Sequence, residues 1–151
     1  MFCAFYRKTP SSFGWDIGPS FPSAGIWRPI ALTAFNHGRI INVKFSCLRT
    51  NAWKVNVEVI IDIPNPGEVG NADSEVVVSI PGVFEASKGL QDGDGEATAD
   101  GLRVVRVQAD VGADAVEVWW PRGFEGKGQR LYELTAELRV GGVAESSKTV
   151  R

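Results

Sequence analysis

The residue with the clearest chemical potential is Asp16, in the segment S-F-G-W-D-I-G-P of residues 12–19. Aromatic side chains at Phe13 and Trp15 precede the carboxylate, and glycines stand on both sides of it. A glycine-flanked loop of this kind can present an acceptor for sugar hydroxyls beside an apolar ring face. A turn in which the carboxylate caps its own backbone explains the same residues equally well. Asp16 and Trp15 are therefore the candidate substrate-binding residues, with the capped turn as the alternative.

Other polar clusters predict no metal or histidine chemistry. Asp92, Asp94 and Glu96 resemble the start of a calcium loop, but no helical pattern flanks them, which favours a solvated acidic turn. His37 is the single histidine, so this chain supplies neither a histidine triad nor a multi-histidine metal site, and a surface or turn position is expected for it. We expect no metal and no cofactor.

No catalytic carboxylate pair can be nominated either, because every acid after Asp16 falls in a predicted turn or on the outward side of a predicted strand. Trp119 and Trp120 could form an aromatic sugar platform. Adjacent strand residues point to opposite faces, so we expect one of them in the core and the other in a domain contact.

The elements that must position these residues divide the chain into two regions. Residues 1–36 are rich in Gly, Pro, Ser and large aromatics and alternate only over residues 27–34, which predicts a long loop leading into one strand. One strand cannot bury that much apolar surface. We therefore expect this region to belong to a truncated domain, whose other strands would cover it.

From Arg39 onward apolar residues recur with a period of two, as in half-buried antiparallel strands. Strands are predicted near residues 39–47, 53–61, 75–80, 102–111, 115–120, 132–140 and 144–150. In the first of them, Ile41, Val43, Phe45 and Cys47 share one face. About seven short strands without a helix predict an all-β immunoglobulin-like antiparallel sandwich. The expected core residues are Trp53, Val55, Val57, Val59, Leu134, Ala136 and Leu138.

Composition agrees with a globular domain. The 151 residues carry a formal charge of −2 with acids and bases well mixed, so neither nucleic-acid nor membrane electrostatics is predicted. No apolar run approaches the ~18 residues of a membrane span. Two cysteines, Cys3 and Cys47, are too few for a disulfide scaffold or a metal cluster and do not identify a compartment.

Two stretches of the chain match a known family. S-F-G-W-D-I-G-P-S-F-P at residues 12–22 and G-I-W-R-P-I at residues 25–30 resemble the F-x-W-D-W-G-P…G-I-W-[RK] stretch of β-mannosidases of glycoside hydrolase family two. V-E-V-W-W-P-R-G at residues 116–123, followed by G-Q-R-L-Y at residues 128–132, resembles the V-E-x-W-W-P-x-G…Y stretch of their immunoglobulin-like domain. Ile17 departs from the family, which has a second tryptophan at that position.

The resemblance implies that residues 1–36 end a galactose-binding-like jelly-roll domain and residues 37–151 form the immunoglobulin-like sandwich that packs on a catalytic barrel. It implies retaining hydrolysis of terminal non-reducing β-mannosyl residues by two barrel glutamates that this chain lacks, so the fragment alone should be inactive. Asp16 would reach the mannose hydroxyls, and Trp15 would shape the same wall. The implied partners are β-mannosides and the remaining domains of the same chain.

The resemblance implies a lysosomal enzyme in animals and a cytoplasmic, periplasmic or secreted one elsewhere. Two other functions remain open. The chain could be a stand-alone carbohydrate-binding sandwich with Trp15, Trp27 and Trp119 as stacking rings, or a structural immunoglobulin-like interaction module whose W-D-x-G-P loop is only a turn.

Overall fold

The computed structural model describes residues 10–14, 18–21, 23–65, 69, 73–91, 95–124 and 126–151. The chain divides into two units, residues 1–34 and residues 35–151. The division lies close to the boundary expected after residue 36. Which domains of a longer protein the two units represent stays a prediction.

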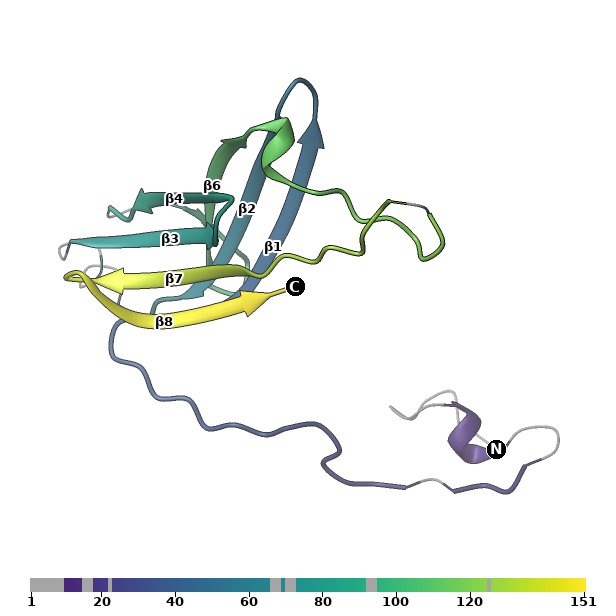
Figure 1. Cartoon of the computed structure of the whole chain (residues 1–151). Coiled ribbons are helices and arrows are strands. Elements are labelled where there is room, and N and C mark those ends of the chain that lie inside the picture. The colour runs from purple at the N-terminus through teal and green to yellow at the C-terminus, as the bar shows by residue number, and fades with distance from the viewer. Residues whose placement is uncertain are drawn as a thin grey trace. The chain divides into compact units, whose positions relative to one another are not determined.

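Residues 35–151 form two antiparallel four-stranded sheets (Figure 1). The first has the order β1-β2-β6-β5, and the second has the order β4-β3-β7-β8. The strands of one sheet run across those of the other. The bounds in the first sheet are β1 Arg39–Arg49, β2 Trp53–Asp62, β5 Glu96–Ala97 and β6 Arg103–Val111, and those in the second are β3 Ser74–Ile80, β4 Phe84–Gly89, β7 Leu134–Val140 and β8 Val143–Val150. The predicted all-β sandwich is confirmed.

The core lies between the sheets and consists almost entirely of branched aliphatic side chains. Alternation along β2 and β7 places every second residue there, because successive side chains of a strand point to opposite faces. All predicted core residues are buried except Trp53, which is half-buried at the start of β2. The fully buried side chains with the largest volumes are Ile61, Leu138, Val57, Val59, Val69, Val76, Val78 and Val105.

The inner face of β1 differs from the predicted one in two ways. A bulge between Ile40 and Asn42 shifts the register, so Ile40 is buried in place of the predicted Ile41. Phe45 lies on the inner side, opposite the buried Val57 of β2, but 48% of it is exposed, and Cys47 further along is exposed too. The inner face of β1 is thus covered in its first half and open in its second.

Two predicted strands do not form. Residues 23–35 form no strand and residues 23–34 are exposed, with Leu32 fully so. An isolated extended segment has no neighbour to satisfy its hydrogen bonds, which is the physical reason that alternation at residues 27–34 produces no strand. Residues 115–120 instead begin in a short 3-10 helix, η3 (Ala113–Ala115), and continue as irregular chain.

Two strands of the structure were not predicted, β4 and β5. Their sequences, F-E-A-S-K-G and E-A, lack an apolar alternation. Beside η3, the described residues contain one further helical segment of defined length, the 3-10 helix η2 (Pro10–Phe13). No helix in the described part of the chain has the length and hydropathy needed to cross a membrane.

Candidate functional site

Asp16 and Trp15, the predicted substrate-binding residues, lie outside the described residues. The chain on either side of them is described. The Ser12 carbonyl accepts hydrogen bonds from the Phe21 N–H at 3.0 Å and from the Ser20 hydroxyl at 3.4 Å. Gly14 has φ +103°, a conformation that favours glycine. The two flanks of the motif are therefore held together at Ser12.

An apolar chamber of about 380 Å³ lies at one end of the sandwich. Its floor includes the buried side chains of Val55, Val111 and Leu134. Its walls also include the exposed end of β1, with Phe45 and Cys47. The chamber exists because the inner face of β1 continues past the region that the second sheet covers.

A long connection between η3 and β7, residues 116–133, forms the other side of the chamber. This connection, which we call the arm, leaves the sandwich and returns to it (Figure 1). Two contacts between its outgoing and returning halves shape it. The Tyr132 hydroxyl accepts a hydrogen bond from the Glu117 N–H at 2.7 Å, and the Trp120 N–H donates to the Gly128 carbonyl at 3.0 Å.

The prediction that Trp119 or Trp120 is a core residue is wrong. Trp119 is 48% exposed on the chamber wall, and Trp120 is half-buried within the arm. The Trp120 ring lies 5.3 Å from that of Phe124, and Lys127 Nζ stands 5.3 Å from the Trp120 ring centroid. The arm leaves the sheet before either indole, so neither can enter the core between the sheets. Whether Trp119 forms a domain contact stays a prediction.

The sequence does not predict the chamber, because the residues that line it come from separate strands and from the arm. A partial signal was present. The apolar alternation of β1 continues to Cys47, while the proline and glycines at positions 121, 123, 126 and 128 mark an excursion from the sheet.

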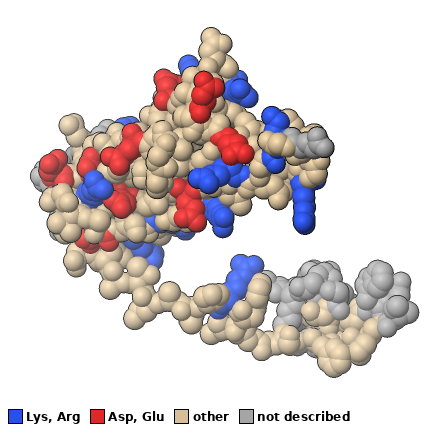
Figure 2. Space-filling view, in the orientation of Figure 1, with Lys and Arg blue, Asp and Glu red and all other residues tan. Residues whose placement is uncertain are grey.

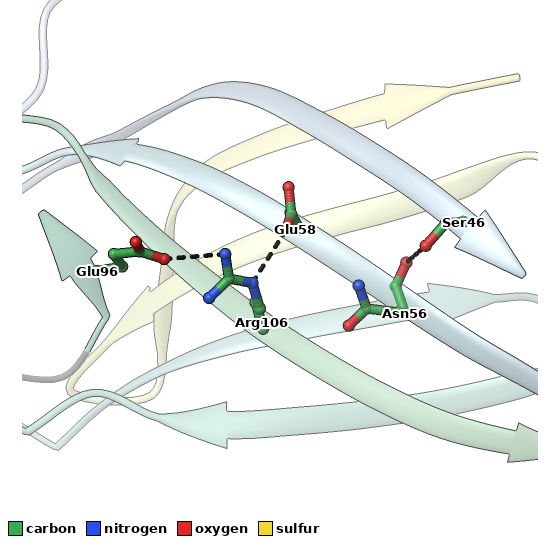
Figure 3. Close-up of polar contacts among 5 residues, drawn as sticks. All are labelled: Ser46, Asn56, Glu58, Glu96 and Arg106. Atoms are coloured by element: carbon green, nitrogen blue, oxygen red, sulfur yellow. Dashed lines mark hydrogen bonds and ion pairs between the residues drawn. The ribbon is translucent and has the colours of Figure 1, made fainter. Parts of the chain in front are cut away.

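Several acids of the sandwich form ion pairs with basic side chains. On the outer face of the first sheet, Arg106 Nε lies 3.0 Å from Glu58 Oε1 and Arg106 Nη2 lies 2.9 Å from Glu96 Oε2 (Figure 3). Hydrogen bonds to Glu58 and then to Glu96 raise the pKa of Arg106 above its ordinary value. Nearby, the Ser46 hydroxyl donates to the Asn56 carbonyl at 3.5 Å. The calcium-like acid Glu96 is thus partnered by an arginine, while Asp92 and Asp94 lie outside the described residues.

On the second sheet, Arg139 has the corresponding role, since its Nη2 lies 2.6 Å from Glu137 Oε2. The hydrogen bond to Glu137 is the main cause that raises the pKa of Arg139. Acidic and basic side chains are interspersed over the face of the sandwich seen in Figure 2. Among the described residues, no three His, Cys, Asp or Glu side chains gather as a metal site would require.

His37 lies in a bend before β1 and is half-buried, in line with its predicted turn position. It belongs to a clasp around Glu145 of β8. Glu145 Oε1 accepts hydrogen bonds from the Asn36 N–H at 2.8 Å and the His37 N–H at 3.2 Å, and His37 Nδ1 lies 3.5 Å from Glu145 Oε2. These bonds, first that from Asn36 and then that from His37, lower the pKa of Glu145.

Comparison with known proteins finds relatives that are named β-mannosidase or β-mannosidase A. No protein-family model matches the chain. A β-mannosidase of Mus musculus is 32% identical over 151 residues, an alignment covering 97% of this chain and 16% of the mouse protein. A β-mannosidase of Bos taurus matches with the same identity and coverage. A β-mannosidase A of Neosartorya fischeri is 28% identical, over 89% of this chain and 15% of its own length.

The fold has a solved counterpart as well. A crystal structure described as "putative beta-galactosidase" from Bacteroides fragilis superposes with a TM-score of 0.56 at 11% identity, covering 77% of this chain and 17% of that one. At that identity the likeness concerns the fold alone. The relatives share their name and match almost all of this chain, whereas the chain spans only 16% of the mouse protein. Over almost its whole length, this chain is therefore similar to β-mannosidases, and it corresponds to a segment of those much longer polypeptides.

Proposed function

We propose that this chain is a non-catalytic segment of a β-mannosidase that, as a longer polypeptide, hydrolyses terminal non-reducing β-mannosyl residues with retention. The observation that carries the proposal is the 32% identity to the mouse β-mannosidase over 97% of the chain. Residues 1–36 would end the first, jelly-roll domain, and residues 37–151 would be the immunoglobulin-like domain beside the catalytic one.

The contacts of the described acids support a non-catalytic role. Retaining glycosidases need two carboxyl groups that face each other across a sugar, one as nucleophile and one as acid and base. Here Glu58 and Glu96 share Arg106, Glu137 pairs with Arg139, and Glu145 binds backbone N–H groups. These four carboxylates are engaged in contacts within the sandwich. The catalytic pair would come from another part of the polypeptide.

Substrate contact by this segment would come from the loop of residues 12–21. We propose that the Asp16 carboxylate accepts hydrogen bonds from mannose hydroxyls and that Trp15 forms an adjoining wall. The hydrogen bonds of Phe21 and Ser20 to the Ser12 carbonyl support this, because they close the loop at its base. A closed base limits the conformations of a loop that must present one carboxylate to a ligand.

The experiment compares two proteins on an aryl β-mannoside. One is the 151-residue chain, and the other is a hybrid in which this chain replaces its matching segment in the mouse β-mannosidase. We expect no turnover by the chain and measurable turnover by the hybrid. A mock purification from cells without the plasmid controls for host glycosidases. Turnover by the purified chain, or a folded but inactive hybrid, would contradict the proposal.

A second candidate function, a stand-alone carbohydrate-binding module, is favoured by the exposure of Trp27 and Trp119, at 81% and 48%. Exposed indoles can stack on sugar rings. However, the Arg28 guanidinium already lies 4.4 Å from the Trp27 ring centroid. Titration of the chain with mannobiose, followed by tryptophan fluorescence, distinguishes the two. Saturable quenching that Trp119→Ala abolishes would favour the binding module.

A further inference from the structure

The first sheet ends in a long strand edge that no other described strand covers. Within the described part of the chain, β1 pairs with β2 alone and forms the outer margin of its sheet (Figure 1). It has 11 residues, and the six from Lys44 to Arg49 are all exposed. The other described edge strands are shorter, with eight residues in β8, six in β4 and two in β5. An edge presents unpaired N–H and C=O groups that can bind a further strand, so a long exposed edge is a candidate binding site.

The start of this edge is closed by side chains of β8. The Ile40 N–H donates to Ser146 Oγ at 3.0 Å, and Lys148 Nζ donates to the Ile41 carbonyl at 2.6 Å. Both backbone groups lie at the bulge, where β1 does not pair regularly. A bulge and a covered edge both prevent the addition of another strand. A strand can therefore be added only to the part of β1 that follows the bulge.

The backbone groups that face outward after the bulge follow from the hydrogen bonds of β1. In an antiparallel pair, residues that bond to the partner strand alternate with residues whose N–H and C=O groups point away from it. The Val43 N–H bonds to Asn42 Oδ1 at 3.0 Å, so Val43 belongs to the outward-pointing set. By the same alternation, three further N–H groups point to the free edge, those of Phe45, Cys47 and Arg49.

Side chains beside the free edge define which strand could be added. Phe45 and Cys47 line the chamber from the inner face of the first sheet, and both are exposed. Directly opposed residues of neighbouring strands point to the same face of a sheet. Residues of an added strand that bond to Phe45 and Cys47 therefore point to the side of the sheet on which the chamber lies. Apolar side chains at those positions would cover the exposed part of Phe45.

The charge of β1 favours an acidic strand over a second copy of β1. The strand contains three basic residues and no acid. One of them, Arg39, forms an ion pair before the bulge. Lys44 and Arg49 form no ion pair within the described residues, and Glu58, which lies opposite Lys44 on β2, is bound to Arg106. Two copies of β1 joined edge to edge would gather these unpaired positive charges, whereas carboxylates of an acidic strand would pair with them.

We propose that residues 43–49 of β1 bind an extended acidic segment of a separate protein as an additional strand of the first sheet. The outward N–H and C=O groups of β1 hold the segment by backbone hydrogen bonds. Its apolar residues, at every second position, cover Phe45 and Cys47, and its carboxylates pair with Lys44 and Arg49. In this mode of recognition, main-chain bonds supply the affinity and alternate side chains supply the specificity. The site goes beyond the proposed function and does not depend on mannoside hydrolysis.

A synthetic peptide with one residue opposite each position of 43–49 tests the proposal. In the antiparallel direction, acetyl-E-T-V-T-V-E-V-amide places its valines on the inner face of the sheet and its glutamates opposite Lys44 and Arg49. Titration of the 151-residue chain, followed by NMR of its backbone amides, should show saturable binding with a dissociation constant on the order of 0.1 mM. Absence of saturable binding would overturn the proposal.

Amide hydrogen exchange identifies the edge that binds the peptide. At a peptide concentration ten times the dissociation constant, exchange at Phe45 and Cys47 should slow about tenfold, because it then proceeds from the small unbound fraction of the protein. Exchange at Lys44 and Ser46, whose N–H groups already bond to β2, should change little. Protection at β4 or β8 in place of β1 would overturn the proposal.

Two variants of Cys47 form a matched pair. Cys47→Pro removes one outward N–H and leaves the bonds of β1 to β2, since proline is tolerated where the N–H of an edge strand faces solvent. It should weaken peptide binding at least tenfold. Cys47→Ser keeps the N–H and should bind the peptide as the wild type does. Wild-type affinity in a folded Cys47→Pro variant would overturn the proposal.

A charge reversal provides a second test that does not rely on proline. Lys44→Glu should weaken binding of the same peptide by roughly two- to fivefold, as expected for one exposed ion pair. The peptide acetyl-E-T-V-T-V-K-V-amide, which carries lysine opposite position 44, should bind this variant more tightly than the wild type. An equal preference of both proteins for the two peptides would overturn the proposal.

Other occupants of the edge would give different results. A second copy of the chain would slow exchange at Phe45 and Cys47 without peptide, increasingly so at higher protein concentration. Residues 1–34 would slow it in the full chain but not in a protein of residues 35–151. Loss of peptide binding in the folded hybrid with the mouse β-mannosidase would show that the remaining polypeptide covers the edge. Any of these three results would overturn the proposal.

Discussion

At the scale of single residues, the bonding partners of a carboxylate indicate whether its role is structural. Glu58, Glu96 and Glu137 are bound to arginines on the outer sheet faces, and Glu145 is bound to backbone N–H groups. Asp16 differs from them in sequence context, since it stands between aromatic and glycine residues. That context made it the one carboxylate for which a substrate role could be predicted from sequence.

Asp16→Asn in the hybrid with the mouse β-mannosidase tests that role. The amide keeps the size of the side chain but removes a charge-assisted acceptor, worth roughly 1.5–3 kcal/mol. At about 1.4 kcal/mol per tenfold, kcat/KM on an aryl β-mannoside should fall on the order of ten- to a hundredfold. The melting temperature should not change. Normal kinetics with a lowered melting temperature would instead identify Asp16 as the cap of its own turn.

The clasp around Glu145 predicts a specific pH dependence. Because the folded protein lowers the pKa of this carboxyl, ionised Glu145 stabilises the fold above the unfolded pKa, about 4.3 for glutamate. That contribution is lost as the pH falls through the lower, folded pKa. Glu145→Gln should therefore reduce the melting temperature at pH 7, and the difference from wild type should shrink below about pH 4. A difference that is constant from pH 7 to pH 3 would contradict this assignment.

At the scale of elements, the sequence was informative wherever a strand is buried on one face over its full length. The alternation in β2 and β7 predicted both the strands and their buried residues. The prediction of strands from alternation failed where the alternating segment does not lie in a sheet. V-E-V-W-W at residues 116–120 alternates as a strand does, yet it leaves the sandwich as part of the arm.

Edge strands can form without an apolar alternation, so alternation alone does not predict them. β4 lies at an edge of its sheet and carries E-A-S-K after Phe84, so its pairing with β3 has no counterpart in an apolar pattern. The bulge in β1 is also invisible from period alone, because it exchanges Ile41 for Ile40, two residues of identical type. The chamber could not be predicted for a related reason, since it depends on where the second sheet stops.

One of the two hydrogen bonds that shape the arm can be removed while the aromatic ring of its acceptor is kept. Tyr132→Phe deletes the acceptor of the Glu117 N–H and keeps the ring that packs against the core. We expect a loss of about 0.5–1.5 kcal/mol in the free energy of unfolding, measured with urea. Amide exchange at Glu117 should accelerate more than at β7, whereas uniform acceleration would mean that the bond is not local to the arm. Tyr132→Leu, which also removes the ring, should cost more.

At the scale of the whole molecule, the two units differ in what stabilises them. Among the described residues, the buried members of the hydrophobic core all lie between Ile40 and Leu138, inside residues 35–151. The described residues 23–34 are exposed throughout, including Ile26, Trp27, Ile30 and Leu32. Since burial of apolar area supplies most of the free energy of folding, the sandwich should carry the stability of the chain.

Truncation tests this division. A protein of residues 35–151 should unfold in urea with the same m-value and with a free energy within about 0.5 kcal/mol of that of the full chain, because m follows the surface exposed on unfolding. A matched control begins at Gly38 and so loses Asn36 and His37, whose N–H groups bind Glu145. Its melting temperature should be lower than that of the 35–151 protein, although only three more residues are absent. If the 35–151 protein were already destabilised by more than about 1 kcal/mol, residues 1–34 would have to contribute to the folded sandwich. Equal stability of all three proteins would instead show that the Glu145 clasp does not stabilise the entry to β1.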